Sequence, residues 1–205
     1  ILGAKAMGEH WPEMSLDGVT GGLYLPQDGW VDPEKMTRFL ANKAKEHGAE
    51  ILTDVLVEGI ELGSRNKIKA VQTSRGRIEC EAVVNAAGMW SPRIAEMVGL
   101  HMPIVPVCHQ HVLTVAMPNH VFPKDKPVLR DPHHLIYIRE HEGGVLIGGF
   151  ELDPVSWKES GVPWSHGDRQ LDPDWPLFKP ILDGAYARVP VLKNAKVRDL
   201  VNHPD

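Results

Sequence analysis

The chain has 205 residues, 42% of them hydrophobic, and a formal net charge of -5 at pH 7. This length can bury a sizeable core in one or two domains. Charges of both signs are scattered along the chain, which argues against a nucleic-acid-binding or membrane-surface protein. No apolar run approaches the roughly 20 residues that a membrane-spanning helix needs.

The two cysteines, Cys80 and Cys108, stand in unlike sequence contexts. A disulfide framework is therefore not expected, and a reducing, intracellular setting is favoured. The N-terminus lacks the layout of a secretory signal. The chain begins at Ile1 and ends at Asp205 without a closing helix or polar tail, so we expect an interior portion of a longer protein.

In chain order, the pattern first predicts a short helix over residues 4–10 and a strand over 22–26. The clearest predicted element is a helix that begins at Pro33, with Asp32 as its N-cap, and ends at Gly48. Its apolar side chains recur at helical spacing: Met36, Phe39, Leu40, Ala44 and His47.

After this helix, several short apolar runs predict strands: Ile51-Leu52, 55–60, 68–73 and 78–85. A helix followed by such strands indicates an α/β layer with a small antiparallel excursion. The second half predicts a long strand over 104–117, a hairpin of 135–139 with 145–150, a surface excursion up to residue 173, and a helix over 174–188.

The stretch VVNAAGMWSP, residues 83 to 92, raises a specific question, because an apolar strand runs into residues with almost no side chains. One interpretation is a tight turn into a helix, with Gly88 in a conformation closed to other residues, Ser91 as N-cap and Pro92 in the first helical position. The other is that a large, flat molecule lies against the backbone at this point.

Along the predicted strand 105–115, alternate side chains share one face, so His109 and His111 project together from an apolar surface. A metal pair is one interpretation, although no cysteine or carboxylate spacing completes such a site. A hydrogen-bonded structural role and a substrate-facing role are the others.

Tyr137 alternates with apolar neighbours on a predicted strand, as either a core aromatic or the polar tip of an apolar pocket. Arg139 and Glu140 are expected to be solvated hairpin charges. Trp157, Trp164 and Trp175 are interpreted as loop covers without chemistry. The chain contains no P-loop, nucleophile elbow or GxGxxG motif.

Taken together, six segments resemble the FAD-dependent amine oxidoreductases of the D-amino-acid oxidase and glycine oxidase superfamily, and within it the dimethylglycine and sarcosine dehydrogenase branch. They are GGLYLPQDGWVDP (21–33), HGAEILTDVLVEGI (47–60), VVNAAGMWSP (83–92), PVCHQHVLT (106–114), IYIREHEGGVLIGGFE (136–151) and DWPLFKPILDGAYARVPVLKNAKVRDLVN (174–202). The last three select the branch.

The resemblance implies a mixed α/β fold, with part of an FAD-binding domain in residues 1–103 and an antiparallel substrate-binding sheet with a returning helix in 104–205. It implies that Ala86, Ala87 and Gly88 stay small to admit FAD, with Trp90 packing nearby. The position of Val57 would contact the adenine through its backbone.

His109 and Tyr137 resemble the substrate-side histidine and tyrosine of the family. They would orient an amine and keep it neutral while hydride leaves its carbon for the flavin. The implied reaction oxidises an N-methylated amino acid to an iminium, which is hydrolysed or passes its one-carbon unit to a folate in another domain. A metal is not implied.

Two departures stand out. The family usually has tyrosine at the position of His111, and Gly-Pro-Glu where this chain has His203-Pro204-Asp205. The alternative to an enzyme is a regulatory protein resembling the pyruvate dehydrogenase phosphatase regulatory subunit. The expected compartment is the cytoplasm for a bacterial protein and the mitochondrial matrix for a eukaryotic one.

Overall fold

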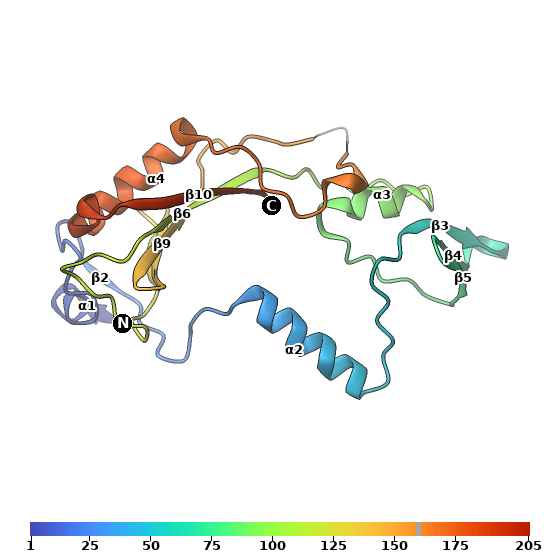
Figure 1. Ribbon diagram of the computed structural model, residues 1–205, viewed down its shortest axis with the longest axis horizontal. Coiled ribbons are helices and arrows are strands. Elements are labelled where there is room, and N and C mark those ends of the chain that lie inside the picture. The colour runs from blue at the N-terminus through green and yellow to red at the C-terminus, as the bar shows by residue number, and fades with distance from the viewer. Residues whose placement is uncertain (159–160) are drawn as a thin grey trace. The chain divides into compact units, whose positions relative to one another are not determined.

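A computed structural model describes residues 1–158 and 161–205, and these form two compact units (Figure 1). The sheet unit comprises residues 1–30, 107–156 and 168–205, and the second unit comprises 31–106 and 157–167. Both contain helices and antiparallel sheets, which confirms the predicted mixed fold class.

The sheet unit is built on five antiparallel strands in the order β10-β6-β9-β8-β7. Their bounds are β6 Cys108–Thr114, β7 Leu129–Asp131, β8 Ile136–His141, β9 Gly144–Gly149 and β10 Val197–Pro204. The predicted hairpin is confirmed as β8 and β9. Glu142 and Gly143 join these strands with φ values of 51° and 81°, the left-handed geometry that a two-residue hairpin turn requires.

Strand β6 is shorter than the predicted 104–117. Pro106 lacks the amide hydrogen that a ladder needs, and the pairing with the C-terminal segment reaches back only to Val107, which exchanges two backbone hydrogen bonds with Asp205.

Helix α4, Trp175–Arg188, covers one face of this sheet and confirms the predicted helix. Asp174 caps it by accepting a hydrogen bond from the Leu177 amide at 3.0 Å. Phe178 and Ile181 pack with apolar side chains from the sheet: Val112, Ile138, Ile147 and Leu200. At Gly149 an added Cβ would lie 2.7 Å from the Ile181 side chain, so the missing side chain lets the helix approach. The short 3-10 helix η4, Pro190–Asn194, follows α4.

Alternation along the strands decides which side chains join this core. On β8, Ile136, Ile138 and Glu140 are buried, while Tyr137 and Arg139 point to the other face and are half-buried. The prediction that Glu140 is solvated was therefore wrong, since it shares the core face and accepts a hydrogen bond from the Gly143 amide at 2.8 Å. Arg139 is not simply solvated either, because its guanidinium lies 4.1 Å from the centre of the Trp30 ring.

The N-terminal part of the sheet unit holds β1 (Leu2–Gly3), α1 (Ala4–His10) and β2 (Gly21–Gly22). Helix α1 confirms the predicted short helix. The predicted strand over 22–26 was wrong, because β2 ends at Gly22 and Leu23 and Leu25 are exposed. Pro26 cannot donate to a ladder, and residues 23–25 pair with no strand within the described chain.

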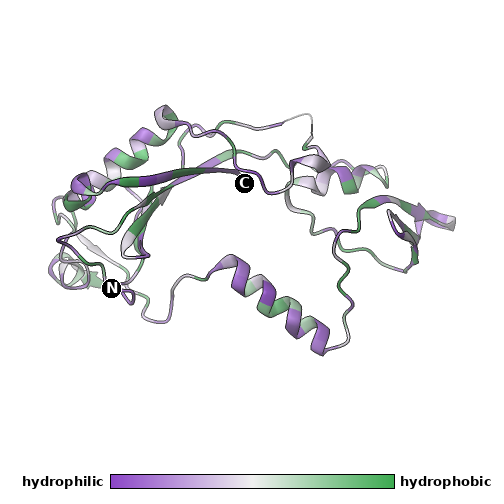
Figure 2. Ribbon diagram, in the orientation of Figure 1, coloured by the Kyte–Doolittle hydropathy of each residue, from purple (hydrophilic) through white to green (hydrophobic). Residues whose placement is uncertain are grey.

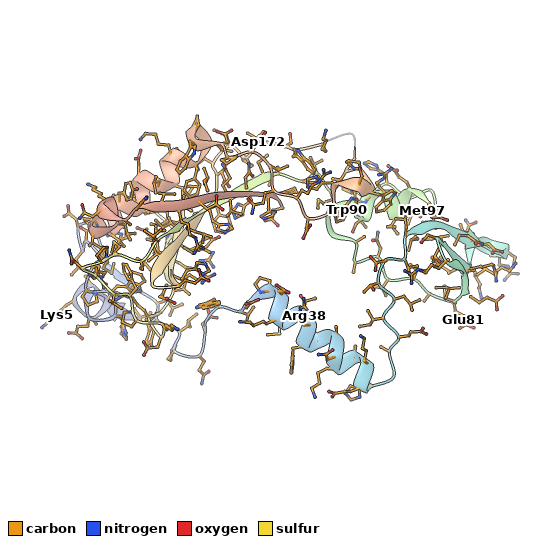
Figure 3. The ribbon with its side chains drawn as sticks, in the orientation of Figure 1. Lys5, Arg38, Glu81, Trp90, Met97 and Asp172 are labelled. Carbon is orange, nitrogen blue, oxygen red and sulfur yellow. The ribbon has the colours of Figure 1, made fainter. Side chains whose placement is uncertain are left out.

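In the second unit, α2 spans Pro33–Glu46 and confirms the predicted helix and its cap, since Asp32 accepts from the Lys35 amide at 3.0 Å. Arg38, which Figure 3 labels on α2, forms an exposed ion pair with Glu34. Figure 2 shows hydrophobic and hydrophilic stretches alternating along α2. Phe39 and Leu40 are exposed, and α2 buries no residue within the described parts of the chain.

The second unit also contains the antiparallel sheet of β3 (Val57–Leu62), β4 (Ile68–Thr73) and β5 (Gly76–Glu79), with the 3-10 helix η1 (Ser64–Asn66) between β3 and β4. These strands confirm the small antiparallel excursion. The prediction of strands at Ile51-Leu52 and through residues 80–85 was wrong. Beyond the bond from the Cys80 amide to Lys69, no neighbouring described strand supplies partners, and Val84 is 90% exposed.

The predicted surface excursion, up to residue 173, is irregular apart from the 3-10 helix η3 (Trp164–His166), and its residues 159–160 lie outside the described chain. Both cysteines are free. Among the helices of the described residues, none combines the length and the apolar character required to cross a bilayer.

A buried ionic cluster ties three segments of the sheet unit together. The Arg188 Nε donates to Asp131 Oδ2 at 2.6 Å, and the His134 Nδ1 lies 2.7 Å from the same oxygen. Arg188 also donates to the Ser15 carbonyl at 2.7 Å. Burial alone would raise the pKa of Asp131, but the hydrogen bonds from His134 and Arg188 lower it to about 2. The cluster thereby joins β7, the end of α4 and the N-terminal loop.

We expect Asp131→Asn to lower the free energy of unfolding by about 3 kcal/mol, because it leaves the buried Arg188 without its charge partner. Urea titration measures this loss. The stability that Asp131 provides is present above pH 3.8 and disappears as the pH falls toward 2, because its folded pKa lies below the ordinary value. The control is Asp183→Asn, which breaks an exposed pair with Lys179 on α4 and costs under about 0.5 kcal/mol. Equal losses in the two variants would contradict the assignment.

Candidate functional sites

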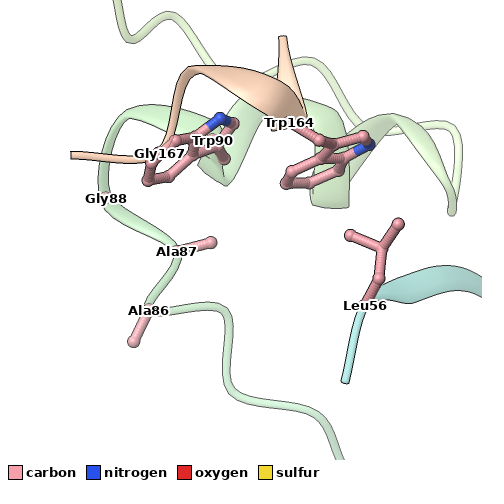
Figure 4. Close-up of a pocket in the computed structure, with 7 residues that line it drawn as sticks. All are labelled: Leu56, Ala86, Ala87, Gly88, Trp90, Trp164 and Gly167. Atoms are coloured by element: carbon pink, nitrogen blue, oxygen red, sulfur yellow. The ribbon is translucent and has the colours of Figure 1, made fainter. Parts of the chain in front are cut away.

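A hollow in the second unit lies in front of the small-residue stretch that follows Asn85 (Figure 4). It has a volume of about 530 Å³. Its lining is apolar and comprises Leu56, Ala86, Ala87, Gly88, Trp90, Trp164 and Gly167. The structure therefore brings together four of the sequence-predicted site residues: Ala86, Ala87, Gly88 and Trp90.

Asn85 organises the turn on which these residues lie. Its Nδ2 donates to the Ser91 carbonyl at 2.9 Å, and its Oδ1 accepts from the Ala87 amide at 3.3 Å. Gly88 has a φ of 53°, which confirms the predicted left-handed conformation. It opens the 3-10 helix η2, Gly88–Trp90, which runs into α3, Ser91–Glu96. Ser91 is consequently the first residue of α3 and not its N-cap, which corrects the prediction.

Two indole rings form the opposite wall of the hollow. The rings of Trp90 and Trp164 stack with centroids 6.4 Å apart and planes 21° from parallel. The Trp90 Nε1 donates to the Pro163 carbonyl at 3.2 Å, and the Arg93 guanidinium lies 4.8 Å from the Trp164 ring centre. The sequence interpretation of Trp164 as a loop cover missed this role, because no local pattern links residue 164 to residue 90.

Val57 does not line the hollow. It begins β3 and is paired in register with Thr73. The preceding residue, Leu56, contributes its side chain instead, and its backbone is held by Ser74, whose Oγ accepts from the Leu56 amide at 3.0 Å.

The hollow fits part of a flat, apolar molecule. One wall presents only methyl groups and the glycine at position 88, and an added Cβ there would meet no atom within 4 Å. The other wall offers aromatic faces, which stack well on planar rings. The structure thus confirms the tight-turn interpretation of the VVNAAGMWSP stretch and shows that the turn borders an open space, whereas contact with a flat molecule at this point stays a prediction.

The second group of candidate residues lies on the face of the five-stranded sheet that α4 does not cover, here called the uncovered face. His111 on β6, Gly148 on β9 and Tyr137 on β8 are cross-strand partners in one row. His109 lies two residues from His111 on the same face and opposite His203 of β10. The predicted common face of His109 and His111 is thus confirmed, and it is the face opposite to α4.

Gly148 makes room for Tyr137. A Cβ at position 148 would overlap the phenol ring of Tyr137, so the ring lies across the glycine toward β6. Burial raises the pKa of the Tyr137 hydroxyl above its usual value. The group is therefore a neutral hydrogen-bond donor throughout the physiological range.

His109 is paired with a buried carboxylate. Its Nδ1 lies 3.2 Å from Glu151 Oε2, and the Gln110 amide donates to Glu151 Oε1 at 3.3 Å. The hydrogen bond with Glu151 raises the pKa of His109 despite its partial burial. Phe150 packs beside this pair, with its ring centroid 6.0 Å from that of His109 and 6.3 Å from that of Tyr137. Sequence reasoning identified neither Glu151 nor Phe150.

His111 differs from His109 in its charge state. Burial, with neighbouring positive groups such as His109 and His203, lowers the pKa of His111 to about 4. It is therefore a neutral imidazole at physiological pH. The described residues contain no cluster of three or more potential metal ligands, and His109 and His111 do not form part of one.

The family described as FAD dependent oxidoreductase (DAO) matches residues 1–202 of the chain. The chain therefore belongs to the DAO family of FAD-dependent oxidoreductases. The cofactor of this family is FAD, and a flat ring system of this kind suits the hollow between Ala87 and the two indoles.

Among curated proteins, the chain is 31% identical to mouse mitochondrial sarcosine dehydrogenase, over 95% of this chain and 21% of that protein. It is 33% identical to human mitochondrial dimethylglycine dehydrogenase, over 100% of this chain and 24% of that protein. The chain spans about a quarter or less of the length of these relatives.

Among solved structures, an L-proline dehydrogenase from P. horikoshii is 25% identical with a TM-score of 0.81, covering 99% of this chain and 51% of that one. A glycine oxidase from Geobacillus kaustophilus is 23% identical with a TM-score of 0.71, and the match covers 100% of this chain and 50% of the oxidase. This second likeness shows a shared fold.

We expect Gly148→Ala to displace the Tyr137 ring from its position across β9. The added methyl overlaps the phenol ring, whose far end can swing away into the open face. The stability cost is about 1 kcal/mol, at the lower end for overpacking. Tyrosine ring resonances in NMR spectra report the displacement, and urea unfolding reports the cost.

The control for this change is Gly3→Ala, at a position of the same unit where an added Cβ meets no atom within 4 Å. It should leave the Tyr137 resonances unchanged. Unchanged Tyr137 resonances in Gly148→Ala would show that the ring does not occupy this place.

Proposed function

We propose that the protein carrying this chain oxidises a small N-methylated amine, of the dimethylglycine or sarcosine type, to an iminium. The observation that carries the proposal is a histidine paired with a carboxylate, His109, and a neutral tyrosine, Tyr137, that share one uncovered sheet face and one aromatic neighbour, Phe150. The names of the relatives add support, because several act on N-methylated amines, including a 4-methylaminobutanoate oxidase from Paenarthrobacter nicotinovorans that is 32% identical.

His109 and Tyr137 have distinct tasks in this proposal. FAD supplies the hydride acceptor for the oxidation of the carbon next to nitrogen. The neutral imidazole of His109 takes a proton from the substrate ammonium, which frees the nitrogen lone pair that the departing hydride requires. The Tyr137 hydroxyl donates a hydrogen bond that orients the substrate. Water then converts the iminium to an aldehyde and the demethylated amine.

For the cofactor, we assign Ala86, Ala87, Gly88 and Trp90 to contacts with FAD and add Trp164 to them. Their support is the open, apolar space that they border. The backbone contact of Val57 with the adenine stays a prediction. The assignment of residues 1–103 to an FAD-binding domain and of 104–205 to a substrate domain also stays a prediction. The same holds for the passage of a one-carbon unit to a folate bound elsewhere.

A regulatory, non-catalytic role is the second candidate. The mouse pyruvate dehydrogenase phosphatase regulatory subunit is 29% identical over the whole of this chain. The presence of both His109 and Tyr137 on the uncovered face favours the enzyme, since a protein used only for interaction has no need of a buried carboxylate behind a histidine.

We expect Ala87→Leu to weaken FAD retention about tenfold or more, because the larger side chain fills the space before the two indoles. Flavin absorbance after gel filtration measures retention. Ala82→Leu is the matched control, since Ala82 is an exposed residue of the same loop that does not line the hollow. If both variants keep FAD equally well, this hollow does not hold the cofactor.

We expect His109→Asn and Tyr137→Phe to slow flavin reduction by sarcosine or dimethylglycine, with FAD retained. The loss at His109 should be about 100-fold, as for removal of a general base. Anaerobic stopped-flow absorbance measures the rate. His47→Asn, at an exposed end of α2, and Tyr186→Phe, on α4, are the controls. Wild-type rates in both site variants would remove the two residues from the site, and absence of reduction by any N-methylated amine would favour the regulatory role.

A further inference from the structure

A buried carboxylate, Glu151, stands behind His109 and is paired with it. Its side chain is only 4% exposed, compared with 22% for His109. Glu151 follows Phe150, the residue after β9, so the backbone of Glu151 is anchored to the sheet. Burying a carboxylate in this way is costly unless hydrogen bonds compensate for the lost water.

The two oxygens of Glu151 are divided between two donors on β6. Oε1 accepts from the Gln110 amide at 3.3 Å, and Oε2 lies 3.2 Å from the His109 Nδ1. The amide fixes the carboxylate relative to the strand that carries His109. A carboxylate can only accept, so the hydrogen of the shared bond belongs to Nδ1 of His109.

From this geometry we infer that Glu151 is a positioning residue, which fixes the tautomer of His109 so that its Nε2 is the basic nitrogen offered to the substrate ammonium. This inference rests on the proposed function of His109. In the step it serves, the N–H bond of the ammonium breaks, a bond forms between that proton and Nε2, and the electron pair stays on the amine nitrogen. Glu151 stabilises the imidazolium that results and does not itself take the proton.

The carboxylates near His109 favour its protonated form. Glu151 is the group that raises its pKa most, and Asp205 at the end of β10 adds to the effect. The histidines that face it, His111 on the same strand and His203 on β10, are the positive or potentially positive groups near it. Burial would raise the pKa of Glu151, but the hydrogen bonds from His109, from its own backbone amide and from Gln110 lower it. Glu151 is therefore ionised at the pH at which His109 takes up a proton.

The pH dependence follows from these directions. His109 acts as a base only when it is neutral, so flavin reduction should rise with pH through a value above the usual 6.5 of histidine. Without the carboxylate, burial remains and lowers the pKa of His109. The acid limb of the rate should therefore move to lower pH in Glu151→Gln, and the rate at the optimum should fall about tenfold, because the tautomer is no longer fixed.

The test has one readout that is independent of turnover. In the FAD-loaded protein with ¹⁵N-labelled histidine, the side-chain shifts of His109 report both its neutral tautomer and its titration. We expect the Nδ1–H tautomer in the wild type, and a titration that moves to lower pH in Glu151→Gln. Glu142→Gln is the matched control, because Glu142 is an exposed carboxylate of the same sheet that pairs with Arg198.

The outcomes separate this inference from the proposed function. An Nε2–H tautomer in the wild type overturns the inference. This measurement uses the wild-type protein alone and so does not depend on the folding of a variant. A slow His109→Asn variant together with an unshifted acid limb in Glu151→Gln also overturns it. Wild-type flavin reduction in His109→Asn instead overturns the proposed function, whatever the tautomer. Glu151→Asp, which keeps the charge one methylene further away, should restore the acid limb in part if the carboxylate acts as inferred.

Discussion

The two-sided character of the five-stranded sheet is the constraint on which the sheet unit depends. Every strand places alternate side chains on opposite faces, and α4 can cover only one of them. The covered face takes the apolar residues and a few satisfied polar ones such as Gln110, whose amide group bonds to the backbone of Asp174. The other face collects the groups that need a ligand or water, including His109, His111, Tyr137 and Arg139.

That division also explains why charged and titratable groups so close together behave differently. His109 has a carboxylate within hydrogen-bond distance, which raises its pKa, whereas burial and then neighbouring positive groups lower the pKa of His111, two residues away. The sheet thus presents one imidazole whose pKa is raised by its carboxylate partner and one that stays neutral at physiological pH. Such a contrast between adjacent groups is a common way to assign acid–base roles in a site.

The hollow in the second unit rests on a different principle, which is the absence of side chains. Gly88 permits the left-handed turn, Asn85 closes it with two side-chain hydrogen bonds, and the alanines leave the space free. The indoles of Trp90 and Trp164 then supply aromatic surface from two distant parts of the chain. The hollow and the sheet face thus carry different chemistry on different parts of the chain, one apolar and aromatic and the other titratable.

The sequence by itself determined the elements whose signals are local. Asp32 with Pro33 marked the start of α2, because a helix cap depends on a few adjacent residues. The pattern of residues 174–188 likewise predicted α4, and the apolar runs on either side of Glu142 and Gly143 predicted the hairpin. The family motifs predicted the cofactor, FAD, and placed His109 and Tyr137 among the candidate site residues. Strand assignments failed where they depended on a neighbour, as at residues 80–85, since an extended segment is a strand only if another backbone bonds to it. The tertiary structure alone decided that Trp164 joins Trp90, that Glu151 stands behind His109 and that Glu140 is buried, because each depends on which distant residues the fold brings within a few ångströms.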